Sequence, residues 1–197
     1  GVIMEIFSDI IHGVQCDDDT LVEAKQLYSK HKDIFEKHPG WEKDNHSLSD
    51  HTFQSNIIQE NDCSKIAGSI SHGLFEYLKM LGHSPSTVNG FSITESWLTH
   101  TINGESARQH NHGNIDVAGV YYIQSNAETD GDLYFMAPES VRYCHKLYRM
   151  IDNQMSFPSE EGTMILFPGW LNHGTRMHTG NTPRISLSFN ISLNYVS

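Results

Sequence analysis

Three histidines in the sequence have a spacing that suits the binding of a metal ion. His110 and His112 are two residues apart, just before the apolar run Val117–Ile123. If that segment is extended, both side chains project from one face, because side chains alternate along a strand. A third histidine, His173, follows another apolar stretch much further along the chain. Neutral imidazole binds iron, zinc, copper and nickel, so these residues predict a metal centre without selecting the metal.

An arginine further along the chain could bind an acidic molecule beside such a centre. Arg184 lies eleven residues after His173 and begins an apolar stretch, with Ser186 two residues further on. A guanidinium group is planar and pairs with a carboxylate through two parallel hydrogen bonds. In a strand, Arg184 and Ser186 face the same side. The sequence therefore predicts a site for a metal ion and an acidic cosubstrate.

The elements that would position these residues change in character near residue 90. Before it, a first strand is expected over Ile3–Val14, and two stretches have the apolar spacing of helices, Thr20–His38 and Cys63–Leu81. A capping box at Thr20–Glu23 predicts the start of the first helix, and Gly82 predicts the end of the second. Short strands are then expected at Phe91–Ile102, Val117–Gln124, Asp132–Met136, Gln154–Phe157, Thr163–Phe167 and Arg184–Leu193, with a hairpin turn at Asn103-Gly104.

This order of elements predicts a mainly β fold with flanking helices, in the α+β class. A double-stranded β-helix, or jelly roll, with two N-terminal helices packed outside it fits the pattern best. The length suits one domain over residues 1–197. Within it, residues 1–89 would form a strand and a helical buttress, and residues 90–197 the metal-binding core.

Composition limits the partners that we expect. The formal net charge of −11 argues against nucleic acid, whose phosphates require clustered Lys and Arg. Three dispersed cysteines indicate reduced thiols in a cytoplasmic protein, and no apolar stretch has the length of a membrane span. The N-terminus has no signal-peptide pattern. A small-molecule or peptide substrate is expected, and an exposed strand edge could pair two copies as a homodimer.

Several of these motifs resemble those of a known family. The region from Ser96 to Leu193 is similar to the Fe(II)/2-oxoglutarate-dependent dioxygenases, and most similar to a group of oxygenases of unassigned substrate. The motifs that carry the resemblance are His110-x-His112, Gly119–Ile123, Asp130–Phe135, Phe167-Pro168 with His173-Gly174, and Arg184-x-Ser186. The resemblance implies a jelly-roll enzyme that hydroxylates an unidentified substrate and releases succinate and CO2.

The resemblance also implies a role for each candidate site residue. His110, His112 and His173 would be the Fe(II) ligands and the catalytic centre. Arg184 would bind the distal carboxylate of 2-oxoglutarate, with Ser186 and Tyr122 adding hydrogen bonds. The family usually has an acidic residue where this chain has His112. Asp116 could supply the missing carboxylate, although a separation of four residues from His112 does not fit strand alternation.

Two alternatives remain open on the residues alone. One is a three-histidine metalloenzyme that does not use 2-oxoglutarate, such as a cupin-like dioxygenase or a zinc hydrolase. The other is a non-enzymatic jelly-roll binding module. Three further expectations concern the surroundings of the histidines. Gln109, Asn111 and Asn172 could orient the imidazoles, and His178 is expected to be exposed. Aromatic residues are expected to line the pocket or fill the core, namely Trp97, Trp170, Tyr121 and Phe135.

Overall fold

Two β-sheets and two helices make up the part of the chain that the computed structural model describes, which is residues 10–37, 50–52, 56–84, 86–138 and 153–196. The larger sheet has the strand order β1-β8-β5-β10-β4-β3-β2, and the smaller one has the order β7-β6-β9. The strands are β1 (His12–Gln15), β2 (Glu36–Lys37), β3 (Asp50–His51), β4 (Val88–Thr101), β5 (Val117–Gln124), β6 (Leu133–Met136), β7 (Gln154–Phe157), β8 (Thr163–Pro168), β9 (His173–Thr175) and β10 (Arg184–Tyr195). The helices are α1 (Asp18–His31) and α2 (Ser64–Met80).

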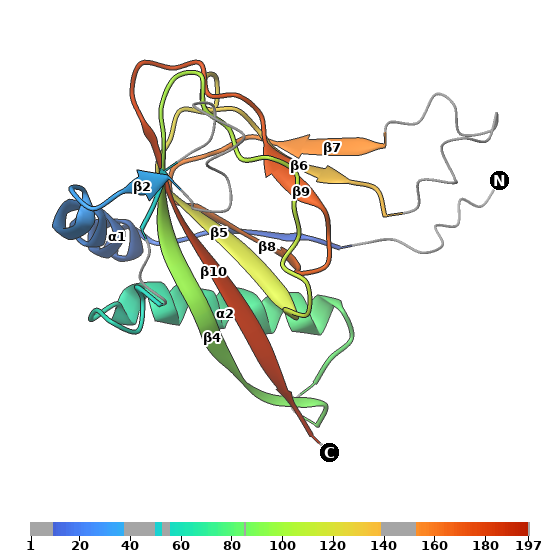
Figure 1. Cartoon of the computed structure of the whole chain (residues 1–197). Coiled ribbons are helices and arrows are strands. Elements are labelled where there is room, and N and C mark those ends of the chain that lie inside the picture. The colour runs from blue at the N-terminus through green and yellow to red at the C-terminus, as the bar shows by residue number, and fades with distance from the viewer. Residues whose placement is uncertain (1–9, 38–49, 53–55, 85, 139–152, 197) are drawn as a thin grey trace, which may run out of the picture.

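The larger sheet forms the middle layer of the molecule. Figure 1 shows α2 crossing the long strands β4, β10 and β5, with the β7-β6-β9 sheet lying apart from the helices. Side-chain alternation along β10 explains this layering. One set of its residues packs with the helices in the larger hydrophobic core, namely Ile185, Leu187, Phe189 and Ile191. The alternate set is more polar and lines a cavity on the other face, namely Arg184, Ser186, Ser188 and Asn190.

The two predicted helices form, but the first ends at His31 and not at His38, with strand β2 at Glu36–Lys37, and it does not begin with the predicted capping box. Asp17 is the N-cap of α1, and its carboxylate accepts bonds from the backbone N (2.7 Å) and the hydroxyl (2.6 Å) of Thr20. The Glu23 carboxylate instead accepts bonds from the backbone N of Lys65 (3.2 Å) and Ile66 (2.7 Å), at the start of α2. One helix therefore satisfies the free N–H groups of the other.

The ends of the elements agree with the sequence at several points. Gly82 follows α2 with φ = 85°, in the left-handed region expected of a helix-ending glycine. The predicted strands all form, and β5 and β7 have the predicted bounds. Of the predicted first strand, Ile3–Val14, residues 3–9 lie outside the described ranges, and the observed strand β1 begins at His12 and ends one residue later than predicted, at Gln15. None of the described helices is long and apolar enough to cross a membrane.

The predicted hairpin at Asn103-Gly104 is wrong, although the turn itself exists. Gly104 has φ = 88°, but β4 pairs with β10 and β3 and not with the segment that follows the turn. The backbone N of Gly104 donates to the carbonyl of His178 (2.8 Å), so the chain leaves β4 toward the loop before β10. The result confirms a mainly β jelly-roll fold with two helices on one face of the larger sheet.

Candidate metal centre and anion pocket

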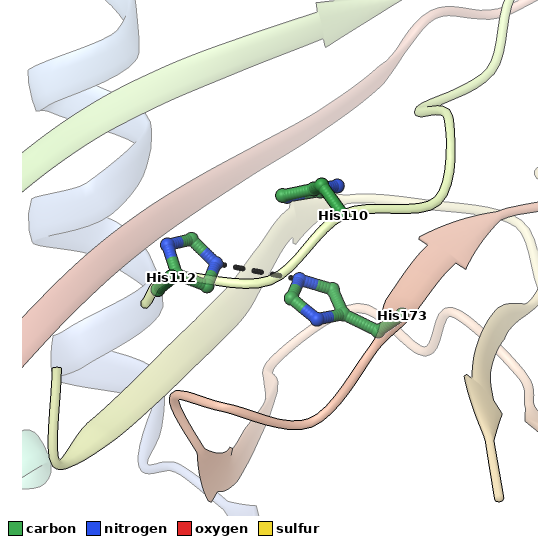
Figure 2. Close-up of side chains that lie close together, drawn as sticks. All are labelled: His110, His112 and His173. Carbon is green, nitrogen blue, oxygen red and sulfur yellow. Dashed lines mark hydrogen bonds between the residues drawn. The ribbon is translucent and has the colours of Figure 1, made fainter. Parts of the chain in front are cut away.

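Three histidines from two separate segments meet on the cavity side of the larger sheet. His110 and His112 lie in the segment between β4 and β5, and His173 is the first residue of β9. One ring nitrogen from each residue lies within 4.8 Å of the other two. Figure 2 shows the close approach of His112 and His173, whose Nε2 atoms are 3.3 Å apart. The structure therefore brings together the three residues that the sequence singled out.

Backbone hydrogen bonds, and not a continuous strand, bring the histidines together. His110 N donates to His173 O and His173 N donates to His110 O, both at 2.9 Å. His112 N donates to the carbonyl of Gly169 at 2.8 Å. At Gly169 a Cβ atom would overlap the carbonyl of Ile115, so only glycine fits this approach of the two loops. In place of the predicted extended segment, an isolated bridge joins the His110 loop to the first residue of β9.

The imidazole rings are oriented for metal binding through Nε2. His110 Nδ1 and His173 Nδ1 each lie 2.8 Å from a backbone carbonyl, that of Arg108 and that of Leu171. A carbonyl can only accept, so the hydrogen of each ring is on Nδ1, and Nε2 is the ring atom whose lone pair can bind a metal ion. Burial is the main cause that lowers the pKa of His112 to about 4 and that of His173 to about 3. Both rings are therefore neutral at pH 7, as ligands must be.

The spacing of one pair of ring nitrogens, those of His112 and His173, fits a shared metal ion. With metal–nitrogen bonds of about 2.1 Å, two neighbouring ligand atoms lie about 3.0 to 3.4 Å apart. The observed 3.3 Å between the Nε2 atoms of His112 and His173 is in that range. Asp116 does not belong to this group. Its carboxylate accepts a bond from Leu193 N (2.8 Å), and it lines a different cavity. The side chains that could bind the metal ion here are therefore all imidazoles.

A cavity of about 530 Å³ contains the histidines together with the predicted carboxylate-binding residues. Arg184, Ser186 and Tyr122 all line it. Arg184 is only 2% exposed. Its Nη1 donates to the backbone carbonyls of Asp130 (2.5 Å) and Gly131 (2.9 Å). Its Nη2 donates to the hydroxyls of two threonines, Thr101 (3.3 Å) and Thr175 (3.2 Å).

Two buried polar atoms in this cavity suit a bound carboxylate. Arg184 Nε and Tyr122 Oη are both inaccessible and have no partner at hydrogen-bond distance, although the side chain of Ser159 lies near enough to Tyr122 to favour its ionised form. Desolvation by burial lowers the pKa of Arg184 and raises that of Tyr122, so burial opposes the charged form of both groups. An anion would supply both the missing acceptor and the missing negative charge. The expected pair of parallel hydrogen bonds from the guanidinium group to a carboxylate is not available, because both Nη atoms already donate to groups of the protein. Nε is the donor of Arg184 that remains.

Several residues that hold Arg184 in place were not predicted. Thr101 and Thr175 belong to strands that are distant in sequence. His178 was expected to be exposed, but this prediction is wrong, because its side chain is fully buried with Nδ1 3.1 Å from Asp130 Oδ1. The Nε2 of His178 lies 2.9 Å from the carbonyl of Thr182. A sequence signal for this pair was the Asp130-Gly131 dipeptide before β6, which also supplies the carbonyls that bind Arg184.

The other candidates near the histidines divide between pocket and core. Trp97 lines the cavity, with its ring centroid 6.1 Å from that of His112. Phe135 is buried, and its ring centroid lies 6.1 Å from that of His173. Tyr121 packs in the larger core on the helix side, and Trp170 is 47% exposed. The amides of Asn111 and Asn172 bond to each other (3.0 Å) and so join the two histidine loops.

Fold and site together define a jelly-roll protein with three clustered histidines and a buried arginine in one cavity. Residues 95–190 match a family model described as "Putative 2OG-Fe(II) oxygenase". The matched segment contains all three histidines and Arg184. The resemblance predicted from the motifs is thereby confirmed. No curated protein matches the sequence.

Solved structures of such oxygenases have the same fold. An oxidoreductase of the 2OG-Fe(II) oxygenase family from Burkholderia pseudomallei is 13% identical, with a TM-score of 0.61 over 89% of this chain and 79% of that chain. The epimerase SnoN of nogalamycin biosynthesis is 12% identical, with a TM-score of 0.66 over 93% of this chain and 78% of the other. A prolyl-4-hydroxylase from Pseudomonas putida is 13% identical, with a TM-score of 0.56 over 93% and 92%. These likenesses establish the fold.

Proposed function

We propose that this protein is an Fe(II)- and 2-oxoglutarate-dependent oxygenase that hydroxylates an organic substrate and releases succinate and CO2. The observation that carries the proposal is the presence, in one cavity, of three converging imidazoles and a buried arginine with an unused donor. The family match supports it. Two structural neighbours are described with such ligands, SnoN with Fe3+ and alpha ketoglutarate and HygX from Streptomyces hygroscopicus with nickel and 2-oxoglutarate.

Each part of the site has a definite task in this proposal. Bound Fe(II) and 2-oxoglutarate would supply the oxygen activation, coupled to oxidative decarboxylation of the cosubstrate. The three histidines hold the metal through Nε2 and contribute no negative charge. Arg184 neutralises the distal carboxylate of the cosubstrate, and the hydroxyl of Tyr122 donates a further hydrogen bond. Phe135 and Phe167 pack against the ring of His173 and keep water from that side of the centre.

The anion pocket favours this function over a three-histidine enzyme that works without 2-oxoglutarate. A zinc hydrolase activates water and needs no buried cation beside its metal. A binding module with a structural metal would have its coordination completed by protein. Here a positively charged group lines the cavity, and an N–H of Arg184 and the hydroxyl of Tyr122 are buried without a partner at hydrogen-bond distance. An anionic cosubstrate accounts for both features, and neither alternative does.

An anaerobic titration of 2-oxoglutarate into the Fe(II)-loaded protein tests the proposal. Chelation of the metal by a 2-oxo acid produces a visible metal-to-ligand charge-transfer band. We expect the band in the wild type and its loss at matched ligand concentrations in Arg184→Met. Arg176→Met is the control, because Arg176 is exposed and lies outside the residues lining the cavity. Absence of the band in a wild-type protein that demonstrably binds iron would refute the proposal.

A further inference from the structure

One wall of the cavity is a ladder of paired side chains from β4 and β10. The register pairs Arg184 with Thr101, Ser186 with Thr99, Ser188 with Trp97 and Asn190 with Glu95. We call these four pairs the polar ladder. Seven of its eight residues line the cavity, and the eighth, Thr101, accepts a hydrogen bond from Arg184. The ladder therefore runs from a cationic inner rung to an acidic outer rung.

The histidine centre lies beside the third rung of this ladder. Trp97 on this rung contacts the histidines, because its ring is tilted against that of His112 at a centroid distance of 6.1 Å. Arg184 lies two rungs away in one direction. Glu95 and Asn190 lie one rung away in the other, about 6.6 Å along the strand. If Arg184 binds the cosubstrate, the outer rung is on the side of the centre that is left for the substrate.

The outer rung presents hydrogen-bond acceptors. Asn190 is only 3% exposed, and its Nδ2 donates to Glu95 Oε2 at 2.6 Å. A carboxylate only accepts, so this bond fixes which side of the amide carries the nitrogen. The other side, Asn190 Oδ1, is buried without a hydrogen-bond partner. An unsatisfied acceptor beside a carboxylate calls for a ligand that brings N–H donors.

The charge and the aromatic wall nearby favour a cationic donor. Glu95 is a solvent-exposed carboxylate, and Asn190 is its only recorded hydrogen-bond partner within the described ranges. Among the described residues that line the cavity, Arg184 is the only Lys or Arg, and it lies at the opposite end of the ladder. Trp97, on the adjoining rung, offers an aromatic face, and such faces attract cations.

We propose that the substrate carries an ammonium or guanidinium group that binds Glu95 and Asn190 on the outer rung. This inference rests on the proposed function and specifies its substrate class. The cationic group donates to the Glu95 carboxylate and to Asn190 Oδ1, with Trp97 packed beside it. The cationic group then binds one rung beyond His112. A carbon atom of the substrate, a few bonds from the cationic nitrogen, would lie in front of the histidines.

Three probes of similar size and different charge test the inference. Phenethylammonium, 2-phenylethanol and 3-phenylpropionate are titrated into the Fe(II)- and 2-oxoglutarate-loaded protein without oxygen, by calorimetry. We expect the ammonium probe to bind about fivefold more tightly than the alcohol, a modest factor because Glu95 is exposed. Glu95→Gln should remove this preference, and Glu95→Lys should transfer it to 3-phenylpropionate. Glu128→Gln, which removes an exposed carboxylate outside the cavity, should change nothing.

The outcomes separate this inference from the function on which it rests. Equal binding of the three probes, together with 2-oxoglutarate binding, overturns the substrate class and leaves the function standing. An ammonium preference that survives Glu95→Gln also overturns it, because the amine would then bind the metal or another wall. A preference that depends on Glu95 in a protein that fails to bind 2-oxoglutarate overturns the proposed function, and with it the assignment as a substrate site. Reversal of the preference in Glu95→Lys cannot arise from misfolding and supports the inference.

Discussion

Arg184 carries a buried positive charge without a carboxylate partner among the described residues. The nearest acid in its network, Asp130, contributes its backbone carbonyl to Arg184 and its carboxylate to His178. Burying a lone cation costs several kcal/mol, and charged hydrogen bonds to neutral acceptors return about 1.5 to 3 kcal/mol each. Because these contributions oppose each other, we expect Arg184→Met to change the unfolding free energy of the unliganded protein by no more than about 2 kcal/mol.

Binding of 2-oxoglutarate should respond far more strongly to the same substitution. Removing one partner of a buried charge pair costs about 2 to 5 kcal/mol, which is a loss of affinity of more than about thirtyfold. A ligand at 100 times its Kd stabilises the folded state by about 2.7 kcal/mol. For a chain of this length that corresponds to a rise in Tm of about 5 to 10 °C.

Thermal unfolding with and without 2-oxoglutarate measures both effects in one experiment. Mn(II) serves as the metal, because it does not require exclusion of oxygen as Fe(II) does. The wild type and the Arg176→Met control should show the full rise in Tm, and Arg184→Met should show less than about a third of it. A rise of wild-type size in Arg184→Met would refute the role of this arginine. If Arg184→Met lowered the unfolding free energy of the unliganded protein by more than about 5 kcal/mol, the argument that the desolvation cost of Arg184 offsets its hydrogen bonds would be refuted.

Three further predictions follow from buried groups. The low pKa values of His112 and His173 mean that the unfolded chain binds more protons below about pH 6.5. Urea unfolding of the metal-free protein should therefore show full stability above that pH and a progressive loss toward pH 4. Tyr122→Phe removes an unpartnered buried hydroxyl, so the melting temperature should stay equal or rise, while the affinity for 2-oxoglutarate measured by calorimetry falls about fivefold. Gly119→Ala would overlap the ring of Phe189 and should lower the unfolding free energy in urea by about 1 to 3 kcal/mol, whereas an unchanged midpoint would show that the ring moves freely.

Local patterns in the sequence were sufficient to predict much of this fold. The three-to-four spacing of apolar residues gave both helices, and the pattern of short strands after residue 90 gave the bounds of β5 and β7. The histidine spacing also pointed to the right cluster, although for a partly wrong reason. His110 and His112 lie in a loop, and its pairing with β9 gives them the orientation expected of a strand.

The features that sequence reasoning missed depend on contacts between distant segments. Glu23 has the spacing of a capping box, yet its carboxylate binds α2, which no local pattern could reveal. Asn103-Gly104 forms a turn, but turn chemistry does not determine which strand pairs with β4. His178 lies in a polar loop, yet it is buried, with Asp130 contacting it from another loop. Each residue required the tertiary structure before its role could be recognised.

The main-chain bonds that position the three histidines have a consequence for the evolution of this centre. His110 and His173 are joined by reciprocal bonds between their own backbone groups, and His112 is fixed through its backbone N to Gly169. None of these bonds depends on an imidazole. A mutation at position 112 can therefore exchange one donor for another while the backbone cradle keeps its shape. A centre with three histidines and a centre with a carboxylate at this position are accordingly one amino-acid substitution apart on the same backbone scaffold.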